Sequence, residues 1–444
     1  MKKAVLATCI ASISTLSSAN VFLPSIGIDG WDSDSQYFRS MAFNQGYLTA
    51  SDAQNHTVNP AFALALQDTA EARMYYSTGF SGGAFTQVFG QNVGIYFGRR
   101  TFDDYLYYYD SNGSGLVDTS VDSSVVGDID GDGNDDTISN LFDAYWASAI
   151  GTGDLGVRLN VRALSSSMES DMQDDTTSVT TEGGLYEFNT TVGFISNSLP
   201  LEGSVTLGLP FGSLEDVNED TDADTKTVEE TSIDKGLRWG ALAKYTLSED
   251  NQARTVLSGF IGSANANYDI VNETTTGGST TTNSDVSFIQ ERFTFGLVAS
   301  HERMINNRTR LIASAGLNRT SSTQGVENKA ADPSQPDYDE YGNWWLPVSI
   351  GTEFRKSEKT TLIGSVASNL FDRDTNANYD NDGGDAAKED ESSMQWTMPN
   401  SNVQFGFAYQ MTPRLSTNLV INKALFVSGL DEGLTTVAEF RYEF

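Results

Sequence analysis

The chain has 444 residues, of which 39% are hydrophobic, and a formal net charge of -33 with a sequence pI near 4.2. A negative charge of this size excludes nucleic acid as a partner, because a polyanion would be repelled. Cys9 is the only cysteine, which excludes a fold held together by disulfide bonds.

Residues 1–19 have the composition of a secretory signal peptide. Lys2 and Lys3 form a positive start, an apolar stretch follows, and Ser17-Ser18-Ala19 supplies small residues for cleavage. We therefore expect an exported mature chain that begins near Asn20.

Alternating apolar and polar residues recur along the rest of the chain. In residues 155–163 the odd-numbered positions are all apolar, whereas Arg158, Asn160 and Arg162 occupy the opposite face. The same period returns near 237–246, 292–300 and 403–410. A strand between lipid and a polar interior has this pattern. The sequence predicts an all-β fold, a transmembrane antiparallel β-barrel of about 14 strands, with the first strand near Phe85–Gly98.

The connections between these segments are alternately short and long. Short turns are expected near 151–154, 196–198, 248–251, 306–307, 356–359 and 411–413. Long polar segments are expected near 102–141, 165–182, 210–233, 270–286, 321–341 and 371–395, with a shorter one near 427–433. Barrels of the bacterial outer membrane have short periplasmic turns, long external loops and an even number of strands. We therefore expect residues 73–444 to form a barrel with long acidic extracellular loops, surrounded by outer-membrane lipid of a Gram-negative bacterium, with both termini in the periplasm.

The carboxy-terminal strand carries the most specific pattern. Phe440, Tyr442 and the terminal Phe444 share one face, and an aromatic end on an alternating strand resembles the assembly signal of outer-membrane barrels. The barrel assembly machinery is accordingly an expected partner.

Charged residues on the interior face of the predicted strands are candidates for a lumen site. They could set the selectivity of a pore, or they could pair with one another and stabilise a filled lumen. The candidates are Arg158, Arg162, Glu187, Arg238, Lys244, Arg292, Glu353 and Arg355.

An acidic loop sequence suggests a metal site. Asp128, Asp130, Asp132 and Asp136 follow the spacing of single-loop calcium sites, and Gly133 would permit the tight turn. Calcium is the one cofactor that the sequence suggests, with the role of ordering a long loop. The alternative is that the acidic loops only keep the surface solvated.

No enzymatic activity is expected. The chain has two histidines, His56 ahead of the predicted barrel and His301 near a short turn. Neither is placed beside a nucleophile and a substrate cleft, as a hydrolase would require.

Residues 20–72 lack sustained alternation and precede the barrel, as a hatch or plug segment would. Arg39-Ser40-Met41-Ala42 and Asn59-Pro60-Ala61 within this segment, together with the strand count, resemble the FadL-like superfamily of outer-membrane long-chain fatty acid transporters, which includes TraF-like barrels. The resemblance implies passive uptake of a hydrophobic small molecule, gated by an N-terminal hatch. Two alternatives stay open: a diffusion porin for small polar solutes, and a surface-structural or adhesin barrel.

Overall fold

The computed structural model describes residues 56–75, 79–98, 107–109, 119–121, 125–127, 136–137, 139–171, 177–220, 224–250, 252–329, 337–380, 387–395, 402–424 and 435–444. The elements are η2 (Pro60–Leu66), β1 (Thr69–Tyr75), β2 (Gly79–Val88), β3 (Gln91–Phe97), β4 (Tyr107–Tyr109), β5 (Thr119–Val121), β6 (Val125–Gly127), β7 (Asp136–Thr137), β8 (Ser139–Ile150), β9 (Gly153–Asp171), β10 (Thr177–Ser196), β11 (Leu201–Asp220), β12 (Thr225–Glu249), β13 (Ala253–Thr276), β14 (Ser279–Asn306), β15 (Thr309–Asn328), β16 (Asp337–Ser357), β17 (Thr360–Asp380), β18 (Ala387–Gln395), β19 (Asn402–Gln410), β20 (Leu415–Ala424) and β21 (Thr435–Glu443). Among these residues no helix has the length and hydropathy needed to cross a membrane.

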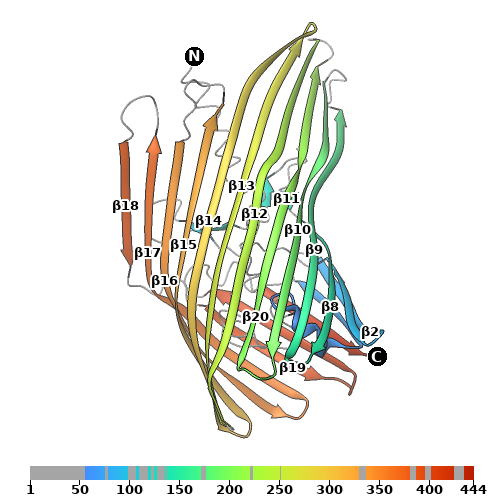
Figure 1. Ribbon diagram of the computed structural model, residues 1–444, viewed down its shortest axis with the longest axis vertical. Coiled ribbons are helices and arrows are strands. Elements are labelled where there is room, and N and C mark those ends of the chain that lie inside the picture. Colours follow the sequence, from blue (N-terminus) through green and yellow to red (C-terminus); the bar gives the residue numbers. More distant parts are fainter. Residues whose placement is uncertain are drawn as a thin grey trace.

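The large sheet closes into an antiparallel barrel (Figure 1). It contains 17 strands, but β18 and β19 both pair with β17. β18 pairs with residues 372–380 of β17, and β19 pairs with residues 360–367. These two strands occupy one position, so the barrel has 16 positions. β1 closes the circle by pairing with β21, where Thr69 lies opposite Glu443. The first strand therefore starts, and the last strand ends, at the same end of the barrel.

The fold class is confirmed, whereas the expected count of about 14 strands is too low. The structure has three strands at the start, β1, β2 and β3, where the sequence indicated one. Phe89 and Gly90 have φ angles of 52° and 78°, which allow the tight hairpin turn that separates β2 from β3. β1 begins at Thr69, so residues 69–72 of the expected hatch segment belong to the barrel.

Most of the expected long loops are continuations of strands. The hairpins of β9 to β17 extend through much of 165–182, 210–233, 270–286, 321–341 and 371–395, and they form the tall part of the wall in Figure 1. Threonine pairs link the extensions, with Thr225 Oγ1 3.5 Å from Thr276 Oγ1 and Thr227 Oγ1 3.2 Å from Thr274 Oγ1. The ladder continues while the apolar alternation stops, because residues beyond the lipid need no apolar face.

The short turns lie where the sequence places them, between β8 and β9, β10 and β11, β12 and β13, β14 and β15, β16 and β17, and β19 and β20. Along the wall strands, where side chains are described, the residues alternate between exposed and buried. On β9, Leu159 is 39% exposed, while Arg158 and Asn160 on either side are buried. The exposed set is largely apolar and the buried set is polar, as expected for a barrel whose exterior faces lipid.

Candidate lumen site

A short segment packs against the inner face of the wall just before the first strand. This inner segment, residues 56–68, contains the 3-10 helix η2 (Pro60–Leu66). Asn59 caps the helix, since its Oδ1 accepts a hydrogen bond from the Ala61 amide at 3.2 Å, and Pro60 occupies the first turn. An asparagine cap followed by proline is a strong helix start, so the Asn-Pro-Ala sequence dictates the local geometry.

Two glycines of the wall make room for this turn. A Cβ atom added to Gly156 on β9 would overlap the backbone of Pro60 and Ala61, and one added to Gly193 on β10 would overlap Asn59 and Pro60. Only glycine lets two backbones approach this closely. The wall and the inner segment are therefore fitted to each other at this point.

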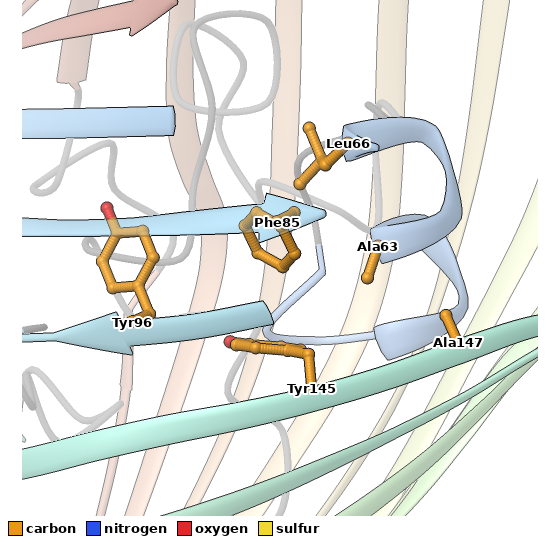
Figure 2. Packing of buried hydrophobic residues seen from close by; sticks show 6 residues of the cluster. All are labelled: Ala63, Leu66, Phe85, Tyr96, Tyr145 and Ala147. Atoms are coloured by element: carbon orange, nitrogen blue, oxygen red, sulfur yellow. The ribbon is translucent and has the colours of Figure 1, made fainter. Parts of the chain in front are cut away.

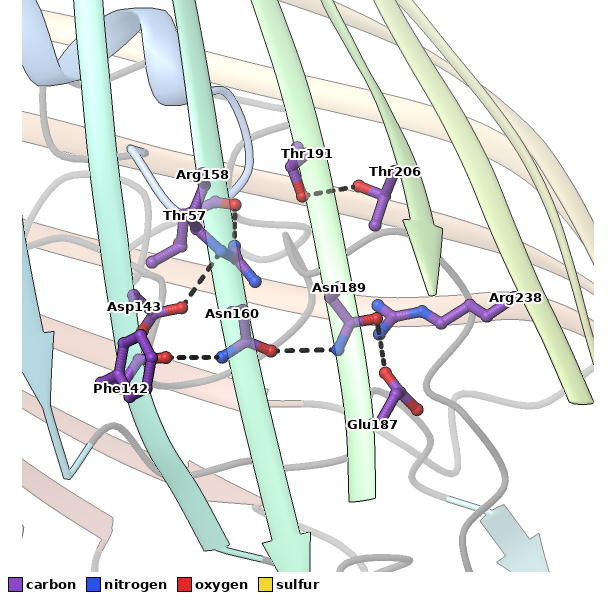
Figure 3. Close-up of polar contacts among 10 residues, drawn as sticks. All are labelled: Thr57, Phe142, Asp143, Arg158, Asn160, Glu187, Asn189, Thr191, Thr206 and Arg238. Carbon is purple, nitrogen blue, oxygen red and sulfur yellow. Dashed lines mark hydrogen bonds and ion pairs between the residues drawn. The ribbon is translucent and has the colours of Figure 1, made fainter. Parts of the chain in front are cut away.

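Hydrogen bonds from the wall hold the inner segment in place. Arg158 Nη1 donates to the Thr57 carbonyl oxygen, and the Asn92 side chain donates to the Ala63 carbonyl oxygen. Asn59 Nδ2 in turn donates to the Phe194 carbonyl oxygen at 3.3 Å. These contacts join the segment to β3, β9 and β10, and Figure 3 shows the first of them.

Apolar contacts complete the docking on that side. Ala63 and Leu66 pack with Phe85, Tyr96, Tyr145 and Ala147 of β2, β3 and β8 (Figure 2). His56 is 1% exposed, and its ring centroid lies 5.1 Å from those of Phe85 and Tyr145. The imidazole is thus enclosed by aromatic rings.

The opposite wall presents an apolar patch to the same segment. Leu242 on β12, Phe260 on β13 and Val298 on β14 are buried together with Val58 of the inner segment, and Phe62 packs against the group. Leu242 lies on the same face of β12 as the buried Arg238 and Lys244. An apolar group among inward positions is unusual for a barrel with a water-filled lumen.

The charged candidates of the sequence analysis lie mainly on the inner wall. Arg158, Arg162, Glu187, Arg238, Lys244 and Arg292 are at most 4% exposed. Glu187 Oε1 lies 2.9 Å from Arg238 Nη1 and 3.7 Å from Arg162 Nη1. Lys244 is separated from these three and pairs with Glu202 at 3.1 Å.

Two of the eight candidates differ from the rest. Glu353 is partly exposed and lies 3.9 Å from Arg310, and Arg355 is exposed. Arg355 comes directly before a register shift next to the hairpin turn, where the alternation of faces ends.

Several members of the inner network were not among the sequence candidates. Asp143 on β8 binds Arg158 at 3.1 Å, and Asn189 links Asn160 to Arg238 through hydrogen bonds of 3.0 and 3.1 Å (Figure 3). Alternation places these residues on the inner face, but only the strand register shows which of them meet. Buried ion pairs that are also hydrogen-bonded, such as these, fix one arrangement of the wall.

Other expected site residues can be placed only in part. Phe440, Tyr442 and Phe444 are 38%, 45% and 56% exposed, on the outer face of the barrel end. Asp128, Asp130 and Asp132 lie outside the described residues, as do residues 1–19, and nothing is described of the Asp136 side chain. Among the described residues no group of acidic or histidine side chains could hold a metal ion.

No family model and no curated relative matches the sequence. The barrel is similar to aromatic hydrocarbon channels. The Ralstonia pickettii toluene transporter TbuX is 10% identical and matches with a TM-score of 0.40, over 93% of this chain and 100% of its own. The Pseudomonas putida toluene transporter TodX is 12% identical, with a TM-score of 0.37 over 94% of this chain and 98% of its own. The monoaromatic hydrocarbon channel CymD is 10% identical, with a TM-score of 0.38 over 95% and 98%.

These channels are FadL-family outer-membrane transporters, the family that the Asn59-Pro60-Ala61 segment resembles. At 10–12% identity the similarity is one of fold.

Proposed function

We propose that this protein takes up a small hydrophobic molecule passively across the outer membrane, with the inner segment acting as a hatch. The observation that carries the proposal is the apolar patch inside the barrel. Val58 and Phe62 of the inner segment cover Leu242, Phe260 and Val298. Movement of the segment would expose this apolar surface to the lumen, where a hydrophobic solute can bind it in place of Val58 and Phe62.

The contacts of the inner segment with β3, β9 and β10 are compatible with movement of the segment as one unit. Arg158, Asn92 and the backbone around Phe194 bind the segment through a few directed hydrogen bonds, and Gly156 and Gly193 accept its turn without linking it covalently. Together with the apolar packing of Ala63 and Leu66, these contacts define a single closed position.

The diffusion-porin alternative receives less support from the inner charges. A selectivity filter requires charges that act on a passing ion. Glu187 instead contacts both Arg238 and Arg162, and Asp143 contacts Arg158. Pairing within the wall favours a structural role for these charges.

Uptake by whole cells tests the proposal, because the lipopolysaccharide leaflet slows the entry of hydrophobic compounds that would cross a simple bilayer unaided. Radiolabelled toluene and a long-chain fatty acid serve as apolar probes and glucose as the polar probe, in a host that lacks its own hydrophobic transporters. We expect faster entry of an apolar probe than in cells without the protein, and unchanged entry of glucose. Faster entry of glucose with unchanged entry of the apolar probes would show a diffusion pore. Unchanged entry of every probe would favour the surface-structural or adhesin barrel.

A variant pair ties uptake to the patch. Val298→Thr places a hydroxyl in the patch with little change of volume, and Val420→Thr does the same at a buried position outside it. We expect Val298→Thr, but not Val420→Thr, to slow entry of the apolar probe several-fold.

A further inference from the structure

One arc of the barrel rim is basic although the chain as a whole is strongly acidic. The arc consists of residues 302–310, 353–359 and 411–414, around the turns that join β14 to β15, β16 to β17 and β19 to β20. These ranges hold seven Lys or Arg residues and three Glu residues, in a chain with a formal charge of -33. The turns lie at the lower end of the barrel in Figure 1.

Most of these cations are exposed and form no ion pair within the described part of the chain. Arg310 pairs with Glu302 at 3.3 Å and with Glu353 at 3.9 Å. Arg303 interacts electrostatically with Asp250. The other five cations are exposed, and none forms an ion pair with the described part of the chain: Arg308, Arg355, Lys356, Lys359 and Arg414. They are therefore available to an external anion.

The arc borders the apolar outer surface. Leu311, Phe354 and Leu362 are exposed on the outer face of β15, β16 and β17. Lys356 lies two residues beyond Phe354, a rise of about 7 Å along a strand. Phosphates of lipid headgroups lie at this height, just outside the hydrocarbon.

The rest of this rim lacks the same charge. With four flanking residues on each side, the turns at 89–90, 151–152 and 197–200 contain neither Lys nor Arg, and the turn at 250–252 has Arg254 alone. A general need for interfacial anchors would distribute cations around the rim. Their concentration on neighbouring hairpins indicates a localised anionic partner.

We propose that this arc binds the headgroups of anionic phospholipids, and that it prefers a diphosphatidyl lipid whose two phosphates can contact cations of neighbouring turns at once. Clustered Lys and Arg next to an apolar surface match the phosphate and the acyl chains of such a lipid together. The proposal is independent of what the lumen transports.

Native mass spectrometry of the detergent-purified full chain tests the proposal. Cardiolipin, phosphatidylglycerol and phosphatidylethanolamine are added separately, and retained lipid is counted. The variant Arg308→Gln/Lys356→Gln/Lys359→Gln is compared with Lys226→Gln/Lys235→Gln/Arg319→Gln, which removes three exposed cations elsewhere. Heat-modifiable migration on a gel confirms that both variants are folded.

We expect the unaltered chain to retain cardiolipin most strongly, the arc variant to retain at least threefold less, and the control variant to match the unaltered chain. Equal retention by the arc variant, or equal retention of phosphatidylethanolamine and cardiolipin, would overturn the proposal. So would loss of cardiolipin on adding a few millimolar inorganic phosphate, since this would indicate a site for a free anion and not for a lipid surface.

Discussion

Glu71 on β1 lies directly opposite Arg441 on β21, and their side chains form an ion pair of 3.1 Å across the seam that closes the barrel. Arg73 and Glu439 form the next opposing pair, at 3.6 Å. All four are on the inner face, with side-chain exposures of 0–20%. The charges alternate around this group, so each carboxylate contacts both arginines.

These charges specify the register of closure. A shift of two residues keeps every side chain on its own face. In one direction it would set Glu71 opposite Glu443 and Arg73 opposite Arg441, and in the other it would set Glu71 opposite Glu439. Like charges directly opposite are destabilising, so both neighbouring registers are disfavoured.

Charge exchange at the seam provides the first prediction. Glu71→Arg or Arg441→Glu alone should reduce the fraction of folded barrel strongly, because each leaves like charges together in a buried place. Exchange of all four residues, Glu71→Arg/Arg73→Glu/Glu439→Arg/Arg441→Glu, restores alternation and should recover most of it. Heat-modifiable gel migration measures the folded fraction, and a four-residue exchange no better than the single variants would contradict the assignment.

The fit between wall and inner segment provides the second. Gly156→Val should displace Pro60 and Ala61, because the added side chain occupies their place. We expect the ion conductance of the variant in planar bilayers to exceed that of the unaltered chain. Gly151→Val is the matched control, since a Cβ at Gly151 meets no atom within 4 Å. Equal conductance of the two variants would show that the segment does not restrict the lumen.

The Asp143–Arg158 pair provides the third. Arg158→Met leaves Asp143 buried without its partner, and we expect a loss of about 3–5 kcal/mol in the free energy of unfolding. Asp143→Asn/Arg158→Met should lose less, since no uncompensated charge remains. Exposed Arg308→Met, as a control, should change stability by less than about 0.5 kcal/mol. Urea unfolding followed by tryptophan fluorescence gives the values, and equal losses in the single and double variants would refute the pairing argument.

The turn between β12 and β13 provides the fourth, a dependence on pH. The Asp250 carboxylate accepts hydrogen bonds from the amides of Gln252 at 2.7 Å and Ala253 at 2.8 Å, and these bonds lower the pKa of Asp250. A carboxyl group with a lowered folded pKa stabilises the fold above its unfolded pKa, and this contribution disappears as the pH falls through the folded value.

Asp250→Ala should therefore destabilise the turn at pH 7, and its difference from the unaltered chain should shrink below the usual Asp range. Amide exchange at Ala253, compared between the two proteins at each pH, measures this difference. A difference that stays constant with pH would contradict the role of the charge.

The parts of the fold that lie in lipid could be predicted from the sequence, and the parts outside could not. Lipid imposes an apolar face on residues 155–163, and so the alternation predicts β9. The upper half of β12 carries polar residues on both faces, with Thr227 and Glu229 on one and Lys226 and Glu230 on the other, so no period distinguishes it from a loop. The turn at Phe89-Gly90 lacks the usual Asn-Gly or Asp-Gly signal, and β2 and β3 therefore merged into one expected strand.

The candidate site shows the same division. Alternation assigns Arg158 and Arg238 to the inner face without knowledge of the fold, since a period of two fixes the face. Their partners Asp143 and Glu187 come from other strands, and pairing across strands depends on a register that the sequence does not display. The apolar patch at Leu242, Phe260 and Val298 was missed for that reason: its members come from three different strands, and only the register shows that they meet.

A reversible tether between the inner segment and the wall tests the central claim most directly. Ala63 and Ala147 belong to one buried cluster, and the sequence has no cysteine besides Cys9, so Ala63→Cys/Ala147→Cys introduces one cysteine pair into a chain produced with Cys9 replaced by Ser. A gel shift verifies the disulfide, and Ala147→Cys alone is the control. A hatch predicts that oxidation abolishes uptake of the apolar probe by whole cells and that reduction restores it. Equal uptake in the oxidised and reduced states would show that solute passes without movement of the inner segment.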